Sequence, residues 1–276
     1  MNRKNILEIQ SLSKGFTRTI KTLSGTNRQE QNWVINQLSM YVPFGKAIVL
    51  IGGNGAGKTT LFNIISGFVK PDAGSIKYSY NNVTIELARM APHQIARKGI
   101  GRMFQDNHIF PEMSILDNML LADDLSQLDL PFLPLIFQRK AKHEEKEKIA
   151  KVKSIFDNIF GSNNIFWEKR ENPARFLSYG QQRLLGLARL FLRDYYLLLL
   201  DEPTSGVNPE VIIQIKNLIK ILIKSNRTVL LIEHNLDVVY DIADFCFFMD
   251  QGRIAWWGTP KDMIGNEEIR KLYIGL

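Results

Sequence analysis

Cysteine is almost absent from this chain: Cys246 is the single one in 276 residues. One cysteine excludes an internal disulfide framework and provides no metal site of its own. It lies in the apolar run 245–248, and this pattern predicts a small hydrophobic side chain buried in a strand. A chain of this length can bury a large apolar core instead.

A long apolar run is also missing. The longest dense stretch, 184–200, is interrupted by Arg189, Arg193 and Asp194, so it is not a membrane-spanning helix. No apolar segment follows the first residues, and we therefore expect no signal peptide. If the protein works at a membrane, we expect it to dock onto something already inserted.

No internal repeat and no low-complexity linker interrupts the sequence, so one domain or two closely joined ones are expected. Hydrophobic residues make up 45% of the chain, which is ordinary for a globular protein. The formal net charge of +7 would favour nucleic acid, an anionic membrane surface or nucleotides. The charge alone does not choose among these partners.

Apolar runs and helical spacing alternate over most of the chain. The pattern predicts strands at 6–9, 34–42, 47–51, 75–80, 84–87, 100–104, 195–200, 228–233 and 245–249. It predicts helices at 61–67, 92–98, 181–192, 209–224 and 236–243. The polar stretch 17–32 is expected to form a loop or a hairpin extension. Such alternation favours an α/β fold with a mainly parallel sheet and helices on both faces.

Strand signals stop between about residues 111 and 176. A long Lys/Glu-rich helix is predicted at 138–160, with apolar residues along one face. We interpret this region as a helical subdomain inserted into the α/β core. Its charge run, 139–153, could be a nucleic-acid patch, but interleaved acidic residues favour a solvated helix face with i,i+4 ion pairs.

The most informative stretch is a glycine-rich loop between a predicted strand and a predicted helix. It matches the phosphate-binding pattern G-x-x-x-x-G-K-[ST], and the whole loop is expected to bind nucleotide: Gly52, Gly53, Asn54, Gly55, Ala56, Gly57, Lys58, Thr59 and Thr60. Its N–H groups would point at an anion beside the positive end of the helix dipole. Lys58 would reach the β- and γ-phosphates, and the Thr59 hydroxyl would ligate Mg²⁺. A glycine-rich turn without a ligand is the alternative, and the complete spacing argues against it.

Two acidic residues follow another predicted strand. The apolar run 197–200 ends in Asp201 and Glu202. Ligands of α/β sheets bind at the carboxyl ends of the strands. We expect Asp201 to hold the hydration shell of Mg²⁺, and Glu202 to polarise the water that attacks the γ-phosphate. Two acids that merely cap a strand are the alternative.

Two further polar residues follow predicted strands. His234 would donate to the γ-phosphate or orient Glu202, although a lone histidine there would be read as an ordinary loop residue. Gln105 follows the strand that leaves the core, and its amide would reach Mg²⁺ or water. The remaining histidines are interpreted as surface or structural residues: His93, His108 and His143.

Ser178 precedes a predicted helix and is a good N-cap residue. The N–H groups behind it predict a second anion site. Nothing in the sequence says that this site faces the glycine-rich loop of the same chain.

The runs GGNGAGKTT, FQ, LSYGQQR, LLLLDEP, SGVN and EH, in this order, resemble the ATP-binding subunits of ABC transporters over nearly the whole chain. The resemblance implies a P-loop ATPase with a RecA-like core and an antiparallel β subdomain, formed by residues 1–110 and 177–276. It implies a helical subdomain at 111–176. ATP and Mg²⁺ would be the cofactors, with Gln105 and Asp201 joining Thr59 at the metal. Catalysis would rest on Lys58, Gln105, Glu202 and His234.

In that family two cassettes form a head-to-tail dimer that holds ATP between them. By resemblance, Ser178, Gly180 and Gln181 would contact the γ-phosphate held by the other subunit. Phe16 falls where the family stacks an aromatic ring on adenine. The polar stretch that follows Phe16 makes its distance from the P-loop longer than is usual in the family.

Two residues depart from the common family pattern. Tyr179 stands where most members have glycine, and Asn208 stands where aspartate is usual. Both variants are similar to the branched-chain amino-acid importer branch, as is the C-terminal part of the chain. Neither change removes a phosphate-binding or catalytic group, but Tyr179 could alter the kinetics of closure.

The resemblance implies a subunit that powers solute import, of a branched-chain amino acid, urea or a similar solute. The partners would be a second ABC ATPase subunit, identical or similar, transmembrane permease subunits and a solute-binding protein. The chain would lie at the cytoplasmic face of the plasma membrane. A cytoplasmic helix of a permease subunit would dock near residues 105–111.

A soluble ABC ATPase acting on nucleic acid or ribosomes is the alternative function. Such relatives usually carry two cassettes in one chain, coiled coils or zinc modules, and this sequence has none of them. We therefore expect no nucleic-acid partner. A non-hydrolysing regulatory cassette is opposed by the intact residues Lys58, Asp201, Glu202 and His234.

Overall fold

The protein is described by a computed structural model that covers residues 5–21, 27–106, 108–123 and 138–266. The chain divides into two compact units. The first contains Met1–Arg102, Tyr196–Pro203 and Ile219–Leu276, and the second contains Met103–Tyr195 and Thr204–Leu218. The chain thus leaves the first unit twice and returns to it twice.

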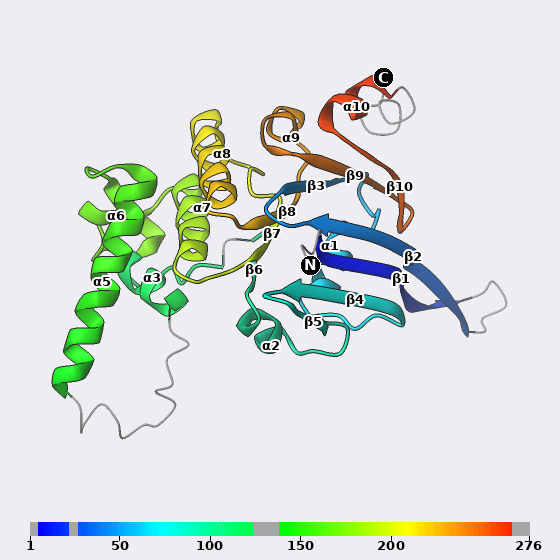
Figure 1. The fold of residues 1–276 in the computed structure, drawn as a ribbon, viewed down its shortest axis with the longest axis horizontal. Helices are drawn as coiled ribbons and strands as arrows, with labels where there is room; N and C mark the ends of the chain where they lie inside the picture. The colour runs from blue at the N-terminus through cyan, green and yellow to red at the C-terminus, as the bar shows by residue number, and fades with distance from the viewer. Residues whose placement is uncertain (1–4, 22–26, 107, 124–137, 267–276) are drawn as a thin grey trace. The chain divides into compact units, whose positions relative to one another are not determined.

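Among the described residues, a six-stranded sheet has the strand order β10-β9-β3-β8-β7-β6 (Figure 1). Its strands are β3 (Ala47–Ile51), β6 (Ile100–Met103), β7 (Leu197–Asp201), β8 (Thr228–Ile232), β9 (Phe245–Asp250) and β10 (Arg253–Gly258). β3 pairs in parallel with β8 and β9, β7 pairs in parallel with β8, and β10 is antiparallel to β9. The predicted α/β fold with a mainly parallel sheet is confirmed.

The central strands β3, β7 and β8 are almost continuously apolar because both of their faces are covered. Every residue in them is buried, as is typical of parallel sheets. Ile232 of β8 is opposite Leu50 of β3 on one side and opposite Asp201 of β7 on the other. The carboxyl ends of the three strands therefore lie at one edge of the sheet, and the loops that follow them begin there.

A second, antiparallel sheet has the order β2-β1-β4-β5 within the described residues. Its strands are β1 (Asn5–Lys21), β2 (Asn27–Pro43), β4 (Ala73–Tyr80) and β5 (Val83–Glu86). β1 and β2 pair as far as Lys21 opposite Asn27, so residues 17–21 and 27–32 of the polar stretch form paired strands, as the hairpin alternative predicted. Backbone pairing requires no apolar side chains, and the extension pairs polar residues such as Thr17 with Gln31.

Helix α1 (Lys58–Ile65) belongs to an apolar core that also contains residues of both sheets. Leu61, Phe62 and Ile65 are fully buried in it. Burial of each such side chain contributes about 1.5–3 kcal/mol. The helix is therefore held firmly, and so is the loop that leads into it. The other helices that lie wholly in the first unit are α2 (Pro92–Arg97), α9 (Leu236–Ile242) and α10 (Pro260–Gly265).

The described part of the second unit is mainly helical. It contains α3 (Ile115–Asp123), α5 (Gln138–Phe160), α6 (Ile165–Glu168), α7 (Tyr179–Ala188), and the 3₁₀ turns η1 (Ala174–Phe176) and η2 (Arg189–Phe191). Phe156 of α5 is buried and stacks on Phe166 of α6, with ring centroids 5.6 Å apart. Helix α8 (Pro209–Lys224) begins in this unit and ends in the first.

The charged side of α5 agrees with the interpretation as a solvated face. The described polar side chains of His143, Glu145, Lys146 and Glu147 are exposed. Among the described side chains of the helix, i,i+4 pairs join Lys153 to Asp157 at 2.6 Å and His143 to Glu147 at 3.3 Å. Exposed pairs of this kind contribute only a few tenths of a kcal/mol each.

Several predicted boundaries were wrong: α1 begins at Lys58 rather than at Leu61, and β1 and β2 extend well beyond the predicted ranges 6–9 and 34–42. The helix expected at 181–192 begins at Tyr179 and ends at Ala188, after which the chain tightens into η2. The following strand begins at Leu197 rather than at Tyr195. The apolar segment 131–137 lies outside the described residues. The division into a core and a helical subdomain at 111–176 stays a prediction, and that range falls within the second unit.

We predict that Gly74→Ala destabilises the protein by at least about 2 kcal/mol. Gly74 has φ +92°, and a Cβ there would lie 2.6 Å from the Leu12 Cα and from the Ser11 oxygen, which are backbone atoms. The free energy of unfolding from urea denaturation measures the effect.

The matched control is Gly186→Ala in α7, where the nearest atom to the new Cβ is the flexible Met103 Cε at 3.8 Å. Alanine favours a helix by about 1 kcal/mol over glycine, so this variant should be as stable as the parent or more so. Equal stability of Gly74→Ala and the parent would contradict the prediction.

Candidate nucleotide-binding site

The glycine-rich loop joins the end of β3 to the start of α1. Gly57 is the N-cap of α1 with φ +103°, and a Cβ there would lie 2.6 Å from the Val34 carbonyl oxygen. Gly52 has φ +152°, and its Cβ would lie 2.1 Å from the Met249 carbonyl oxygen. Both positions therefore require glycine, because the loop is seated against the backbones of β2 and β9.

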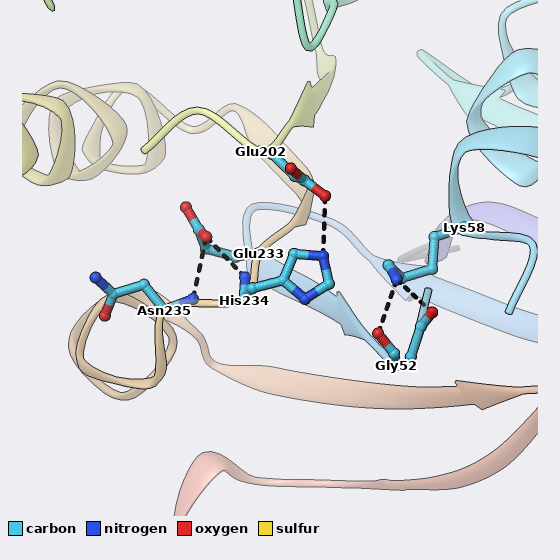
Figure 2. A network of polar contacts seen from close by, with 7 residues as sticks. Gly52, Lys58, Glu202, Glu233, His234 and Asn235 are labelled. Atoms are coloured by element: carbon cyan, nitrogen blue, oxygen red, sulfur yellow. Dashed lines mark hydrogen bonds and ion pairs between the residues drawn. The ribbon is translucent and has the colours of Figure 1, made fainter. Parts of the chain in front are cut away.

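The Lys58 ammonium group lies over this loop. Its Nζ donates to the carbonyl oxygens of Gly52 at 2.7 Å and Gly53 at 2.9 Å (Figure 2). Lys58 is only 7% exposed. This burial lowers its pKa below the usual value, and the carboxylates of Glu202 and Asp201 oppose the shift. The loop thus carries a cation held by backbone oxygens, where a phosphate group would meet it.

The two predicted acids stand at the end of β7, as expected. Asp201 is the last residue of the strand and is buried. Glu202 follows with φ +46°, a conformation that non-glycine residues rarely adopt. Its N–H donates to the Ile232 carbonyl oxygen at 3.0 Å. This bond ties the turn after β7 to the end of β8.

The structure brings His234 to Glu202. The His234 Nε2 and the Glu202 Oε1 lie 2.9 Å apart, and Figure 2 shows the imidazole ring turned toward the carboxylate. The two residues follow neighbouring parallel strands. A histidine in this position can orient a carboxylate and exchange a proton with it.

Arg102 is a member of this site that the sequence analysis did not single out. Its Nη2 lies 3.5 Å from the Asp201 Oδ2, and the two side chains are only 6% and 2% exposed. Its Nη1 donates to the Ser66 hydroxyl at 2.6 Å. The sequence did carry one signal of its role: Arg102 is a charged residue within the predicted strand 100–104, and a buried charge needs a partner of opposite sign.

The residues present fit a magnesium ion. The Oδ1 atom of Asp201 is buried and accepts no hydrogen bond from any described residue. The pKa of Asp201 is raised above its usual value because the carboxylate is buried, and the Arg102 guanidinium opposes this shift. Thr59 lies in the first turn of α1. Asp201 and Thr59 would hold the ion through oxygen atoms, the ligand type that Mg²⁺ prefers. No group of three His, Cys, Asp or Glu residues that could hold a metal occurs in the described ranges.

Phe16 lies on β1 in the same unit as the glycine-rich loop, and it is 46% exposed. The Lys14 ammonium is 5.4 Å from the centre of its ring. Asp72 pairs with Lys14 at 2.7 Å and accepts the Gly15 N–H at 2.8 Å. The ring is therefore accessible on a firmly anchored strand, and its stacking on adenine stays a prediction.

The predicted N-cap at Ser178 is confirmed within the second unit. The Ser178 Oγ accepts the Gln181 N–H at 3.3 Å, and the Gln181 Oε1 accepts the Ser178 N–H at 2.9 Å, which is a capping box. A Cβ on Gly180 would lie 2.8 Å from the Val211 Cγ2. Contact of Ser178, Gly180 and Gln181 with a phosphate stays a prediction.

The two departures from the family pattern fit their surroundings. The Asn208 Oδ1 accepts the Val211 N–H at 2.9 Å, so asparagine caps α8 as well as aspartate would. A Cβ on Gly206 would lie 3.5 Å from Cε1 of the Tyr179 ring, so the ring lies beside the turn that contains Gly206. Gln105 is exposed and belongs to the second unit. Its predicted role at the metal stays a prediction.

The fold and the loop geometry define a P-loop nucleoside triphosphatase. Residues 35–205 match the family model described as ABC transporter, and the chain belongs to that family. It is therefore an ATP-binding and ATP-hydrolysing subunit of the ABC ATPase class.

Relatives of known name agree with this assignment. The chain is 35% identical to the high-affinity branched-chain amino acid transport ATP-binding protein BraF of Pseudomonas aeruginosa, with 94% of this chain and 99% of that protein aligned. It is 32% identical to the corresponding protein LivG of Escherichia coli, with 87% and 91% aligned.

A solved structure shows the same fold. The ADP conformation of MJ1267, an ATP-binding cassette of an ABC transporter, matches with a TM-score of 0.77 and 27% identity, covering 99% of this chain and 100% of that one. Within the part of the chain that the structure describes, none of the helices has the length and apolar character needed to cross a membrane.

We predict that Arg102→Met destabilises the protein by about 3 kcal/mol or more, because it leaves the buried Asp201 carboxylate without its partner. The double variant Arg102→Met/Asp201→Asn should recover part of this loss. The free energy of unfolding in urea measures both.

The matched control is Lys220→Met, which breaks the exposed pair between Lys220 and Asp241. Removal of an exposed pair costs about 0–1 kcal/mol. If Arg102→Met lowered the free energy of unfolding no more than this control does, the buried ion pair would not stabilise the fold as its geometry indicates.

Proposed function

We propose that this chain powers the import of a small solute through partner membrane subunits. The observation that carries the proposal is the near full-length similarity to proteins named as branched-chain amino acid transport ATP-binding proteins. The cargo is an amphipathic amino acid or a related small solute such as urea. A solute-binding protein delivers it, and the chain works at the cytoplasmic face of the plasma membrane.

Each polar residue of the P-loop site has a distinct part in hydrolysis. The glycine-rich loop, residues 52–57, and Lys58 bind the phosphates and neutralise their charge. Thr59, Asp201 and Gln105 would hold a Mg²⁺ ion, which would help to neutralise the charge of the phosphates. Glu202 takes a proton from the attacking water.

His234 holds the Glu202 carboxylate in place, and the 2.9 Å distance between the two side chains supports this role. The ring of Phe16 stacks on adenine. Thr60 completes the nucleotide-binding loop, which then contacts one end of ATP while Phe16 contacts the other.

A second ABC ATPase subunit completes the site. The start of α7, with Ser178, Gly180 and Gln181, binds the γ-phosphate held by the other subunit of a head-to-tail dimer. The capping box supports this proposal, because it fixes the N-terminal turn of α7. Closure on ATP and reopening after hydrolysis drive the membrane subunits.

The contact with a permease subunit lies on the second unit near residues 105–111. Phe110 is exposed there, and Phe176 is 70% exposed. The Arg175 N–H donates to the Pro111 carbonyl oxygen at 2.9 Å, so the two segments are joined. Two exposed aromatic rings on joined segments provide an apolar surface for an amphipathic helix.

Action on nucleic acid or ribosomes is not favoured. The named relatives are transport proteins, and the charged face of α5 carries paired acidic and basic residues.

Copurification from detergent-solubilised membranes tests transport against action on nucleic acid: membrane subunits and a bound solute are expected to copurify with this chain. Recovery of ribosomes or DNA without membrane proteins would overturn the transport function.

We predict that Glu202→Gln lowers the turnover of ATP by about 100-fold or more, because the amide cannot accept the proton of the attacking water. Binding of ATP should persist, so the variant should accumulate as an ATP-bound dimer. Phosphate release and gel filtration with ATP and Mg²⁺ measure these effects.

The matched control is Glu145→Gln on the exposed face of α5, which should hydrolyse ATP at the parental rate. Unchanged turnover in Glu202→Gln would remove Glu202 from the role of base.

A further inference from the structure

Glu233 is a buried carboxylate that lies next to the pair His234 and Glu202 without belonging to it. It follows β8 directly and is only 2% exposed. Burial of a carboxylate is costly unless hydrogen-bond donors compensate for the lost water. The contacts of Glu233 therefore indicate what the rest of the site requires of it.

The carboxylate folds back onto the turn that follows it. The Glu233 Oε2 accepts the N–H of His234 at 2.7 Å and the N–H of Asn235 at 3.2 Å (Figure 2). Asn235 in turn caps α9, because its Oδ1 accepts the N–H groups of Asp237 at 3.0 Å and Val238 at 3.3 Å. The Glu233 carboxylate thus holds the N–H of His234 and that of the next residue, and the Asn235 side chain holds the start of the helix that follows.

The residue fixed in this way is the one that reaches Glu202. The two side chains meet at 2.9 Å. The backbone of Glu202 is itself bonded to the Ile232 carbonyl oxygen at 3.0 Å. Both members of the pair are therefore anchored at the end of β8, Glu202 through Ile232 and His234 through Glu233.

We propose that Glu233 is a positioning residue that aims the His234 imidazole at Glu202. The proposal rests on the roles given above to Glu202 and His234 in hydrolysis. In this role Glu233 acts on the reaction only through His234. Without its acceptor oxygen the His234 backbone can rotate, and the imidazole loses its fixed direction. A displacement of about 1 Å in such a site can slow a reaction about 100-fold.

The direct test compares Glu233→Met with Glu233→Gln. Methionine keeps the length of the side chain but has only a weakly accepting sulfur, whereas glutamine keeps an accepting oxygen. Turnover of ATP by the purified full-length chain should fall about tenfold or more in Glu233→Met. It should stay within about threefold of the parent in Glu233→Gln, and KM for ATP should change little in either variant.

A double variant separates positioning from general support of the fold. In the His234→Ala background, Glu233→Met should cause no further loss of turnover, because Glu233 acts through His234. Thr259→Ala is the matched control. It removes another side-chain cap of the first unit, which accepts the Asp262 N–H at 3.2 Å, and it should lower the melting temperature without lowering turnover.

A second measurement does not depend on activity. The chain has four histidines, so the imidazole nitrogen signals of His234 can be assigned with His234→Ala. In Glu233→Met these signals should move toward the values of free histidine, and in Glu233→Gln they should stay near the parental values.

The proposal is overturned if Glu233→Met leaves both turnover and the His234 signals unchanged, or if its effect on turnover is as large without His234 as with it. Full turnover in Glu202→Gln and His234→Ala would instead refute the proposed roles of those residues. In that case the imidazole signals still decide whether Glu233 orients His234.

Discussion

The parallel register of β3, β7 and β8 is the constraint on which the rest of the site depends. Ile232 of β8 lies opposite Leu50 of β3 and opposite Asp201 of β7, so the carboxyl ends of the three strands meet at one edge. Each strand then contributes one functional loop. A register slip of a single residue would turn the side chains of a strand to the other face and separate the loops.

Electrostatic balance is the second constraint at this edge. The Lys58 ammonium interacts electrostatically with the carboxylates of Asp201 and Glu202. The Arg102 guanidinium forms an ion pair with Asp201. Buried charges of this kind persist only when each has a partner. A nucleotide and a Mg²⁺ ion bound here, as we propose, would add charges of both signs, and the backbone dipoles and paired side chains would receive them without reorganisation.

The variant residues of the second unit show how a family pattern can change without loss of local structure. Asn208 caps α8 through the same kind of side-chain oxygen that aspartate would use. Tyr179 places its ring against Gly206. The ring of Tyr179, at the start of α7, therefore occupies space beside the turn that precedes α8, which a glycine at this position would leave open.

The sequence by itself determined the glycine-rich loop, the acids after β7, the N-cap at Ser178 and the alternation that specifies a parallel sheet, because each follows from local spacing. Only the tertiary structure decided that Arg102 meets Asp201 and that Glu233 holds the backbone of His234. The first contact joins residues 99 positions apart, and the second depends on how a buried side chain folds back. Local patterns specify which residues form a strand or a cap, but partners distant in sequence are chosen by sheet register and packing.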